Sequence, residues 1–147
     1  GGAAPLQEGL PDLVLPCLGS ERAVNLAQLR GRPLVVNLWA QWCAPCKAEA
    51  PVLAEFARRA GDQVAVVGIN YADPDPAAAI AFAGSAGWAY PHLVDAGALL
   101  RARLSLPGIP VTLLVAADGR VVYRVTGGID SVERLTALAR DRLGVTA

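Results

Sequence analysis

Residues 34–51 read LVVNLWAQWCAPCKAEAP, and this stretch decides the fold. The run PLVVNLWA (33–40) is almost continuously apolar, which is typical of a β-strand covered on both faces. From 44 to 60 the apolar residues instead recur with the period of a helix. Two of the chain's three cysteines, Cys43 and Cys46, therefore lie where a buried strand gives way to a helix.

The spacing of these two cysteines predicts redox chemistry. A spacing of three places Cys43 and Cys46 on one side of the first helical turn, close enough to bridge. The thiolate is the reactive form of cysteine, and a helix N-terminus stabilises it by about 0.3–2 kcal/mol. We expect Cys43 to be an exposed nucleophile that caps the helix, and Cys46, beside Pro45, to be the shielded resolving thiol.

Two alternatives to redox chemistry fit the pair less well. A zinc site needs two further ligands, and only Cys17 and His92 remain to supply them. A chance pair of buried cysteines is possible in principle, but a C-x-x-C beside a strand–helix pattern is the cue for a thioredoxin-like redox motif. We expect neither a metal nor a cofactor.

Composition favours one globular domain. The 147 residues are 18% charged, with 13 basic and 13 acidic side chains, so nothing suggests a nucleic-acid partner. There is no run of about 18 apolar residues, and the opening residues do not resemble a signal peptide. Because the chain contains no methionine, we expect a processed or truncated product that has lost an export signal or membrane anchor.

The remaining pattern alternates strands and helices, which implies a parallel core with an antiparallel hairpin at one edge. We expect a flexible lead-in (1–10), followed by a single α/β domain (11–147) with a mixed sheet. Its predicted strands are 12–15, 33–40, 63–71, 92–95, 111–116 and 120–126, with Asp118-Gly119 as the hairpin turn. Its predicted helical segments are 25–31, 44–60 (kinked at Pro51), 73–87 (opening with turn residues), 98–104 and 130–144.

A second motif, Gly108-Ile109-Pro110-Val111-Thr112, follows WCAPC at a distance of about 65 residues. Together the two motifs resemble the thioredoxin superfamily. Residues 10–143 resemble its TlpA/ResA/CcmG(DsbE)-like extracytoplasmic thiol–disulfide oxidoreductases. The resemblance implies a central mixed sheet flanked by helices, an N-terminal strand extension and an αβ insert at 72–92. It also implies that Pro110 is cis beside the cysteines, and that Ile109 offers its backbone to an extended substrate.

The amide in the predicted strand 33–40 fits this resemblance. Ordinary thioredoxins have a buried aspartate at the position of Asn37, where it exchanges protons with the buried thiol, but an amide does not titrate. Glu49 lies one helical turn beyond Cys46, and the TlpA/ResA-like proteins carry a glutamate at the matching place. We expect Glu49 to accept the proton of Cys46 if burial raises its pKa, the alternative being a solvated helix glutamate.

Further residues are assigned by their positions. Trp42, Ala44, Pro45 and Ile109 are predicted to contact the substrate, whereas Trp39 is predicted to be a core residue. Lys47 is expected to be solvated and His92 structural. Cys17 is an inert buried thiol, a partner for another chain or a second resolving cysteine, and the sequence leaves these open.

The expected function is thiol–disulfide exchange with exported protein substrates by a monomeric enzyme. The resemblance favours a reductase of the cytochrome c maturation kind, acting on apocytochrome c and re-reduced by a membrane thiol carrier. An oxidant of secreted proteins, served by an oxidase, is the alternative, since potentials of related folds span about −270 to about −120 mV. Copper handling, peroxide reduction and a non-catalytic binding module are less favoured, because the spacing is CxxC and Ala40 stands where a peroxidase has threonine.

Overall fold

A five-stranded mixed sheet forms the centre of the protein. The computed structural model describes residues 9–145. The strand order is β5-β4-β3-β6-β7, in which β4 is parallel to β3 and β5, and β6 is antiparallel to β3 and β7. The bounds are β3 (Leu34–Trp39), β4 (Ala65–Tyr71), β5 (His92–Asp95), β6 (Val111–Val115) and β7 (Val121–Thr126).

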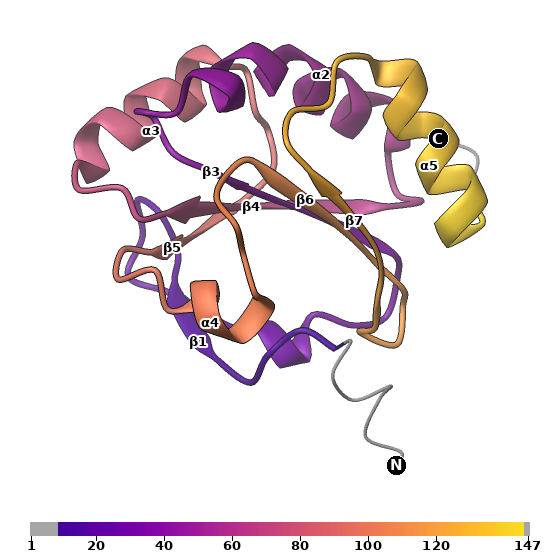
Figure 1. Ribbon diagram of the computed structural model, residues 1–147, viewed down its shortest axis with the longest axis horizontal. Coiled ribbons are helices and arrows are strands. Elements are labelled where there is room, and N and C mark those ends of the chain that lie inside the picture. Colours follow the sequence, from indigo (N-terminus) through magenta and orange to yellow (C-terminus); the bar gives the residue numbers. More distant parts are fainter. Residues whose placement is uncertain (1–8, 146–147) are drawn as a thin grey trace.

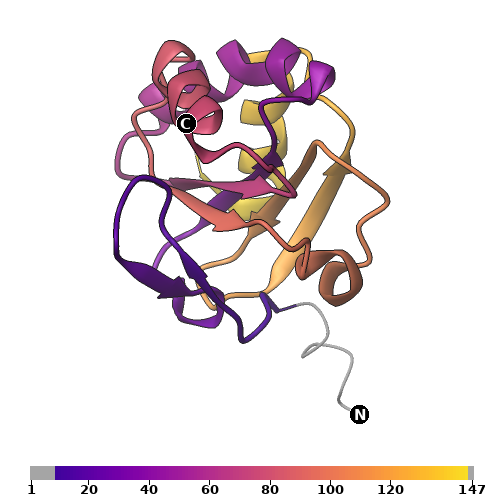
Figure 2. The ribbon, with the colours of Figure 1, turned by 90° about the vertical axis from the view of Figure 1, so that its left-hand side faces the viewer.

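Two layers cover this sheet (Figures 1 and 2). One face carries the three longer helices, α2 (Ala44–Ala60), α3 (Pro76–Ser85) and α5 (Val132–Leu143). The other face carries an antiparallel hairpin, a 3₁₀ turn and a short helix, namely β1 (Val14–Pro16), β2 (Ala23–Asn25), η1 (Leu26–Gln28) and α4 (Leu100–Leu104). The arrangement confirms the predicted fold class, with β1–β2 as the N-terminal extension and α3–β5 as the insert.

The period of two along β3 divides the core between these layers. Leu34, Val36 and Leu38 pack into the cluster beneath β1–β2, η1 and α4. Val35 and Trp39 pack into the cluster beneath α2 and α3. Asn37 shares the parity of the second group, so the strand's only polar side chain points toward α2.

Local signals explain most of the element bounds. The predicted helix 44–60 matches α2, which continues through Pro51. Asn25 caps η1 by accepting a hydrogen bond from the Ala27 N–H. The segment 73–87 opens with turn residues, as predicted, and α3 begins after Asp75, its N-cap, which accepts from the Ala78 N–H. Ser131, rather than Asp130, caps α5.

The N-terminal boundary lies earlier than expected. Most of the predicted flexible lead-in (1–10) falls outside the described residues, but Gly9 and Leu10 do not. Gly9 forms a β-bridge with Arg120, and the buried Leu10 donates its N–H to the Gly119 carbonyl. The packed domain thus includes residues that the sequence assigns to the lead-in. Within 9–145, no helix is both long and apolar enough to cross a bilayer.

Candidate active site

The site begins where β3 delivers the chain to the N-terminus of α2. Cys43 and Cys46 form a disulfide, with their Cα atoms 5.2 Å apart. Cys43 is the N-cap of α2, and its sulfur accepts a hydrogen bond from the Cys46 N–H at 3.2 Å. This N–H, together with the helix dipole, would favour the Cys43 thiolate once the disulfide is reduced.

The loop that leads into β6 lies over the disulfide. The Ile109–Pro110 peptide bond is cis, which confirms the expectation for Pro110, and Pro110 is buried. The carbonyl oxygen of Ile109 is 3.8 Å from the Cys43 sulfur. Cys43 is consequently only 3% exposed and Cys46 is 0% exposed. The expectation of a freely exposed Cys43 is wrong for the disulfide form, although Cys43 remains the more accessible of the two.

Glu49 is buried one helical turn beyond Cys46. Its side chain is 2% exposed, so the alternative of a solvated helix glutamate is wrong. Its Oε1 accepts from Asn37 Nδ2 at 2.7 Å, and its Oε2 accepts from the Ile129 N–H at 3.0 Å. Burial raises the pKa of Glu49, and the hydrogen bonds from Asn37 and Ile129 offset this only in part. A carboxyl with a raised pKa is suited to taking up a proton near neutral pH.

The sheet register fixes the amide that holds this carboxyl. Asn37 of β3 lies opposite Thr112 of β6, and Asn37 Nδ2 also donates to Thr112 Oγ1 at 3.1 Å. The sequence did not predict roles for Thr112 or Ile129. Thr112 carries the same signal as Asn37, a single polar residue in an apolar strand. The contribution of Ile129 is a backbone N–H, which no side-chain pattern reveals.

An aromatic cluster packs between the sheet and the disulfide helix. Trp39 is fully buried and donates its Nε1–H to His92 Nδ1 at 3.0 Å. Trp88 makes an edge-to-face contact with Trp39 and donates to the Ala50 carbonyl of α2 at 3.0 Å. Burial lowers the pKa of His92 to about 4, so the ring stays neutral and accepts from Trp39. Trp39 is thus a core residue, as predicted, and the contacts of His92 are structural.

The residues predicted to contact substrate surround the disulfide. Trp42 is 53% exposed, and its Nε1–H donates to the Ala72 carbonyl at 3.1 Å. Ala44 and Pro45 are exposed on the first turn of α2, and Ile109 is half-buried. Lys47 is exposed as expected. The structure therefore brings these four residues together around Cys43, and their role in binding remains a prediction.

Cys17 lies apart from the pair as a free, half-buried thiol. It follows β1, where it forms a β-bridge with Leu93. It packs at the edge of the apolar cluster beneath β1–β2, η1 and α4, and its three possible roles stay open. Among residues 9–145, no group of three or more His, Cys, Asp or Glu side chains is arranged to hold a metal ion.

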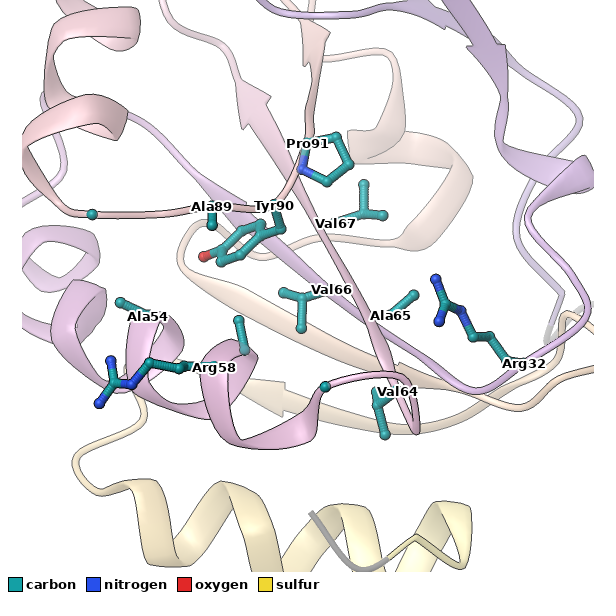
Figure 3. A pocket seen from close by; sticks show the side chains of 13 residues that line it. Arg32, Ala54, Arg58, Val64, Ala65, Val66, Val67, Ala89, Tyr90 and Pro91 are labelled. Atoms are coloured by element: carbon teal, nitrogen blue, oxygen red, sulfur yellow. The ribbon is translucent and has the colours of Figure 1, made fainter.

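Two hollows of similar volume mark the surface, and only one adjoins the disulfide. A hollow of about 510 Å³ is lined by Trp42, Ile109 and Arg101, among others. A second, of about 500 Å³, lies at the other end of α2, between Arg58, Tyr90 and the start of β4 (Figure 3). Neither hollow is lined by a cysteine. The first is lined by Trp42, which precedes Cys43 in the chain, and by Ile109, whose carbonyl oxygen is 3.8 Å from the Cys43 sulfur, so it adjoins the redox site.

Fold and site together define a protein of the thioredoxin fold with a redox-active cysteine pair. The comparisons with known proteins agree. The chain belongs to the Redoxin family, whose model matches residues 6–138.

Named relatives narrow the class within this family. Thiol:disulfide interchange protein DsbE of Pseudomonas fluorescens biotype C is 35% identical over 123 residues, which cover 83% of this chain and 67% of the relative. Thiol-disulfide oxidoreductase ResA of Bacillus subtilis is 30% identical over 129 residues, covering 86% and 71%. The matches to the curated relatives span between 52% and 71% of those relatives' length.

A solved structure supports the same assignment. A secreted disulfide oxidoreductase of Mycobacterium tuberculosis, described as homologous to E. coli DsbE, superposes with a TM-score of 0.75 at 29% identity. The match covers 86% of this chain and 92% of that one. The cysteine pair and these relatives make the chain a thiol–disulfide oxidoreductase, and the predicted TlpA/ResA/CcmG(DsbE)-like resemblance is confirmed.

Proposed function

We propose that this oxidoreductase acts outside the cytoplasm on disulfides of protein substrates, working mainly as a reductase. The observation that carries the proposal is the Cys43–Cys46 disulfide at the N-terminus of α2, beside the cis-proline loop. The buried carboxyl of Glu49 on the same helix supports it.

The first step would use Cys43. In the reduced protein, the Cys43 thiolate attacks one sulfur of a substrate disulfide, forming a mixed disulfide and releasing one substrate thiolate, which takes a proton from solvent. The Cys46 N–H and the start of α2 stabilise the thiolate. The exposed edge of the Ile109 loop would hold the substrate backbone in an extended form.

The second step would use Cys46 and Glu49. Cys46 is fully buried, so its thiol requires an internal proton acceptor, and the Glu49 carboxylate is one helical turn away. The Cys46 thiolate then attacks the Cys43 sulfur, releases the second substrate thiolate and closes the ring. Two electrons pass to the substrate, and a separate dithiol must return them to the protein.

The relatives support the location and the exchange of disulfides. DsbE is named a thiol:disulfide interchange protein, and the M. tuberculosis protein is described as secreted. From the resemblance to the TlpA/ResA/CcmG(DsbE)-like proteins, we propose the reductive direction, with apocytochrome c as a substrate and a membrane thiol carrier as the electron donor. An oxidant of secreted proteins, re-oxidised by a membrane oxidase, is the second candidate, because the N-cap hydrogen bond to Cys43 favours the reduced form.

Trapping of mixed disulfides tests the proposal. Cys46→Ser should accumulate a covalent complex with a disulfide-containing substrate protein, whereas Cys43→Ser should form none. Cys17→Ser, added to Cys46→Ser, is the matched control. Cys17 is the one cysteine outside the pair, so its loss should leave the trapped complex unchanged. Trapping through Cys17 would contradict the assignment.

The redox potential then decides between the two directions. Equilibration with glutathione or dithiothreitol buffers gives the potential of the Cys43–Cys46 couple. A value near about −270 mV supports the reductase, and one near about −120 mV supports the oxidant.

A further inference from the structure

The hollow beside the disulfide extends well past the residues that the sequence predicts to bind substrate. Trp42 and Ile109 lie next to Cys43, and Tyr71, Ala72 and Leu106 also line the hollow. We call this hollow of about 510 Å³ the α4 groove, because α4 and the loop after it form its outer wall. Arg101 is the charged side chain in its lining, and the other lining side chains are apolar or, in Trp42 and Tyr71, aromatic with one polar group each.

Backbone strain gathers around the same groove. Within the described part of the chain, three residues other than glycine have a left-handed backbone: Ala72 (φ 53°), Ala98 (φ 55°) and Ser105 (φ 52°). Ala72 and Ala98 line the groove, and Ser105 immediately precedes Leu106 of its wall. Such conformations cost about 1–3 kcal/mol each, and they concentrate at functional sites. The fold therefore maintains the shape of this groove at a cost in stability.

Arg101 is the charge that the groove presents. It is exposed, and its side chain makes no hydrogen bond or ion pair with any residue between 9 and 145. Arg103, two residues along the same helix, is exposed as well, but its Nη1 donates to the Asp12 carbonyl at 3.2 Å and it does not line the groove. Arg103 is thus already hydrogen-bonded within the protein, whereas the Arg101 guanidinium is available to a ligand.

Two carboxylates next to groove residues in the chain, Asp95 before Ala98 and Asp73 after Ala72, are already bound by other donors. Asp95 is buried and accepts from the N–H groups of Leu99 and Leu100 at the start of α4. Asp73 is buried as well and accepts from Asn70 Nδ2 and the Gln41 N–H. Burial alone would raise the pKa of Asp73, but these hydrogen bonds lower it, so the group is a satisfied carboxylate.

We propose that the α4 groove binds the substrate segment next to the reactive cysteine and selects an acidic side chain there through Arg101. The proposal rests on the proposed function and names its substrate class: protein segments with an apolar residue and an aspartate or glutamate close to the exchanging cysteine. The apolar residue packs on Trp42 and Leu106. The carboxylate pairs with the guanidinium, which suits planar bidentate contacts.

The position of the groove sets how many residues can separate the acidic side chain of the substrate from its exchanging cysteine. The Ile109 carbonyl, 3.8 Å from the Cys43 sulfur, belongs to the loop that forms the groove's near wall. An extended substrate advances about 3.3–3.6 Å per residue. A carboxylate one to three residues from the substrate cysteine therefore reaches the groove while the sulfurs exchange.

Matched peptides test this selectivity. Two peptide disulfides that differ only in glutamate or lysine two residues from the cysteine are reduced by the full chain, and the second-order rate constants are compared. Wild type should prefer the glutamate peptide about two- to fivefold, the range expected for a pair at a solvated rim. Arg101→Glu should reverse the preference, and Arg101→Gln should abolish it.

Arg103→Glu is the control for general electrostatics. It changes the net charge by the same amount on the same helix, so the glutamate preference should persist in it. An equal loss of preference in Arg103→Glu and Arg101→Glu would overturn the groove as the source. Equal rates for both peptides with wild type would also overturn it, and would leave the proposed function intact. Failure to reduce any disulfide, a small aromatic disulfide included, would instead contradict the proposed function.

Discussion

The two faces of strand β3 differ in what they contribute. Toward β1–β2 and α4, it presents only aliphatic side chains, Leu34, Val36 and Leu38, all within one apolar cluster. Toward α2 it presents Asn37 and Trp39, both of which donate hydrogen bonds to titratable side chains. The same six residues therefore anchor an apolar core on one side and position the redox chemistry on the other.

The cost of this division is visible in unpaired polar atoms. Among the described residues, four buried side-chain atoms have no hydrogen-bond partner: Asn37 Oδ1, Tyr90 Oη, His92 Nε2 and Thr136 Oγ1. All belong to segments on the α2 side of the sheet or to α5, which covers that side. An unsatisfied buried group costs about 1–3 kcal/mol. The aliphatic face must therefore supply stability that the redox face gives up.

The largest expected effects come from one substitution on each face. On the aliphatic face, Leu38 is fully buried. Leu38→Ala would leave a cavity there, so the free energy of unfolding should fall by about 2–5 kcal/mol. Glu49→Gln keeps one acceptor oxygen where the carboxylate serves two donors, so it should cost about 1–3 kcal/mol of stability. It should slow ring closure by Cys46 about 10²-fold or more, because the buried thiol loses its proton acceptor.

Two measurements separate these effects. Denaturant unfolding gives stability. Release of the second coloured thiol, after reduced protein reacts with an aromatic disulfide, gives the rate of ring closure. The division between faces fails if Leu38→Ala, under conditions where it is folded, slows ring closure as much as Glu49→Gln.

A glycine pair sharpens the comparison by probing the packing of the redox face. A Cβ on Gly68 of β4 would lie 2.0 Å from His92 Nδ1 and 2.9 Å from Trp39 Nε1, so Gly68→Ala should cost about 3 kcal/mol. Gly84 on α3 has nothing within 4 Å of such an atom, and Gly84→Ala should stabilise the protein by about 0.4–1 kcal/mol. Thermal unfolding of both variants checks the pair, and equal melting temperatures would show that His92 is not packed against Gly68.

The sequence predicted those parts of the site that lie close together in the chain. α2, its Cys43 cap and the position of Glu49 follow from a motif and a helical period within 17 residues. The partners of Glu49 do not, because Asn37 reaches it from the sheet to the helix and the Ile129 N–H comes from 80 residues away. Arg101 was missed for the same reason: only the packed fold places α4 beside Trp42.

The last expected effect is a pH dependence of stability that belongs to the redox face alone. Burial lowers the folded-state pKa of His92 from 6.5 to about 4, so below pH 6.5 the unfolded chain binds a proton that the folded protein does not. Stability should therefore fall as the pH drops from 6.5 toward 4, by about 1.4 kcal/mol at pH 5.5. Glu49 acts with the opposite sign, because its raised pKa adds stability at low pH that is lost as the pH rises. Denaturant unfolding at pH 7.5 and 5.5 gives the change in unfolding free energy for wild type and for His92→Gln. The difference between these two changes is the contribution of His92. Parallel pH profiles for the two proteins would mean that His92 is already charged in the folded state, in which case its Nδ1 could not accept the hydrogen bond from Trp39.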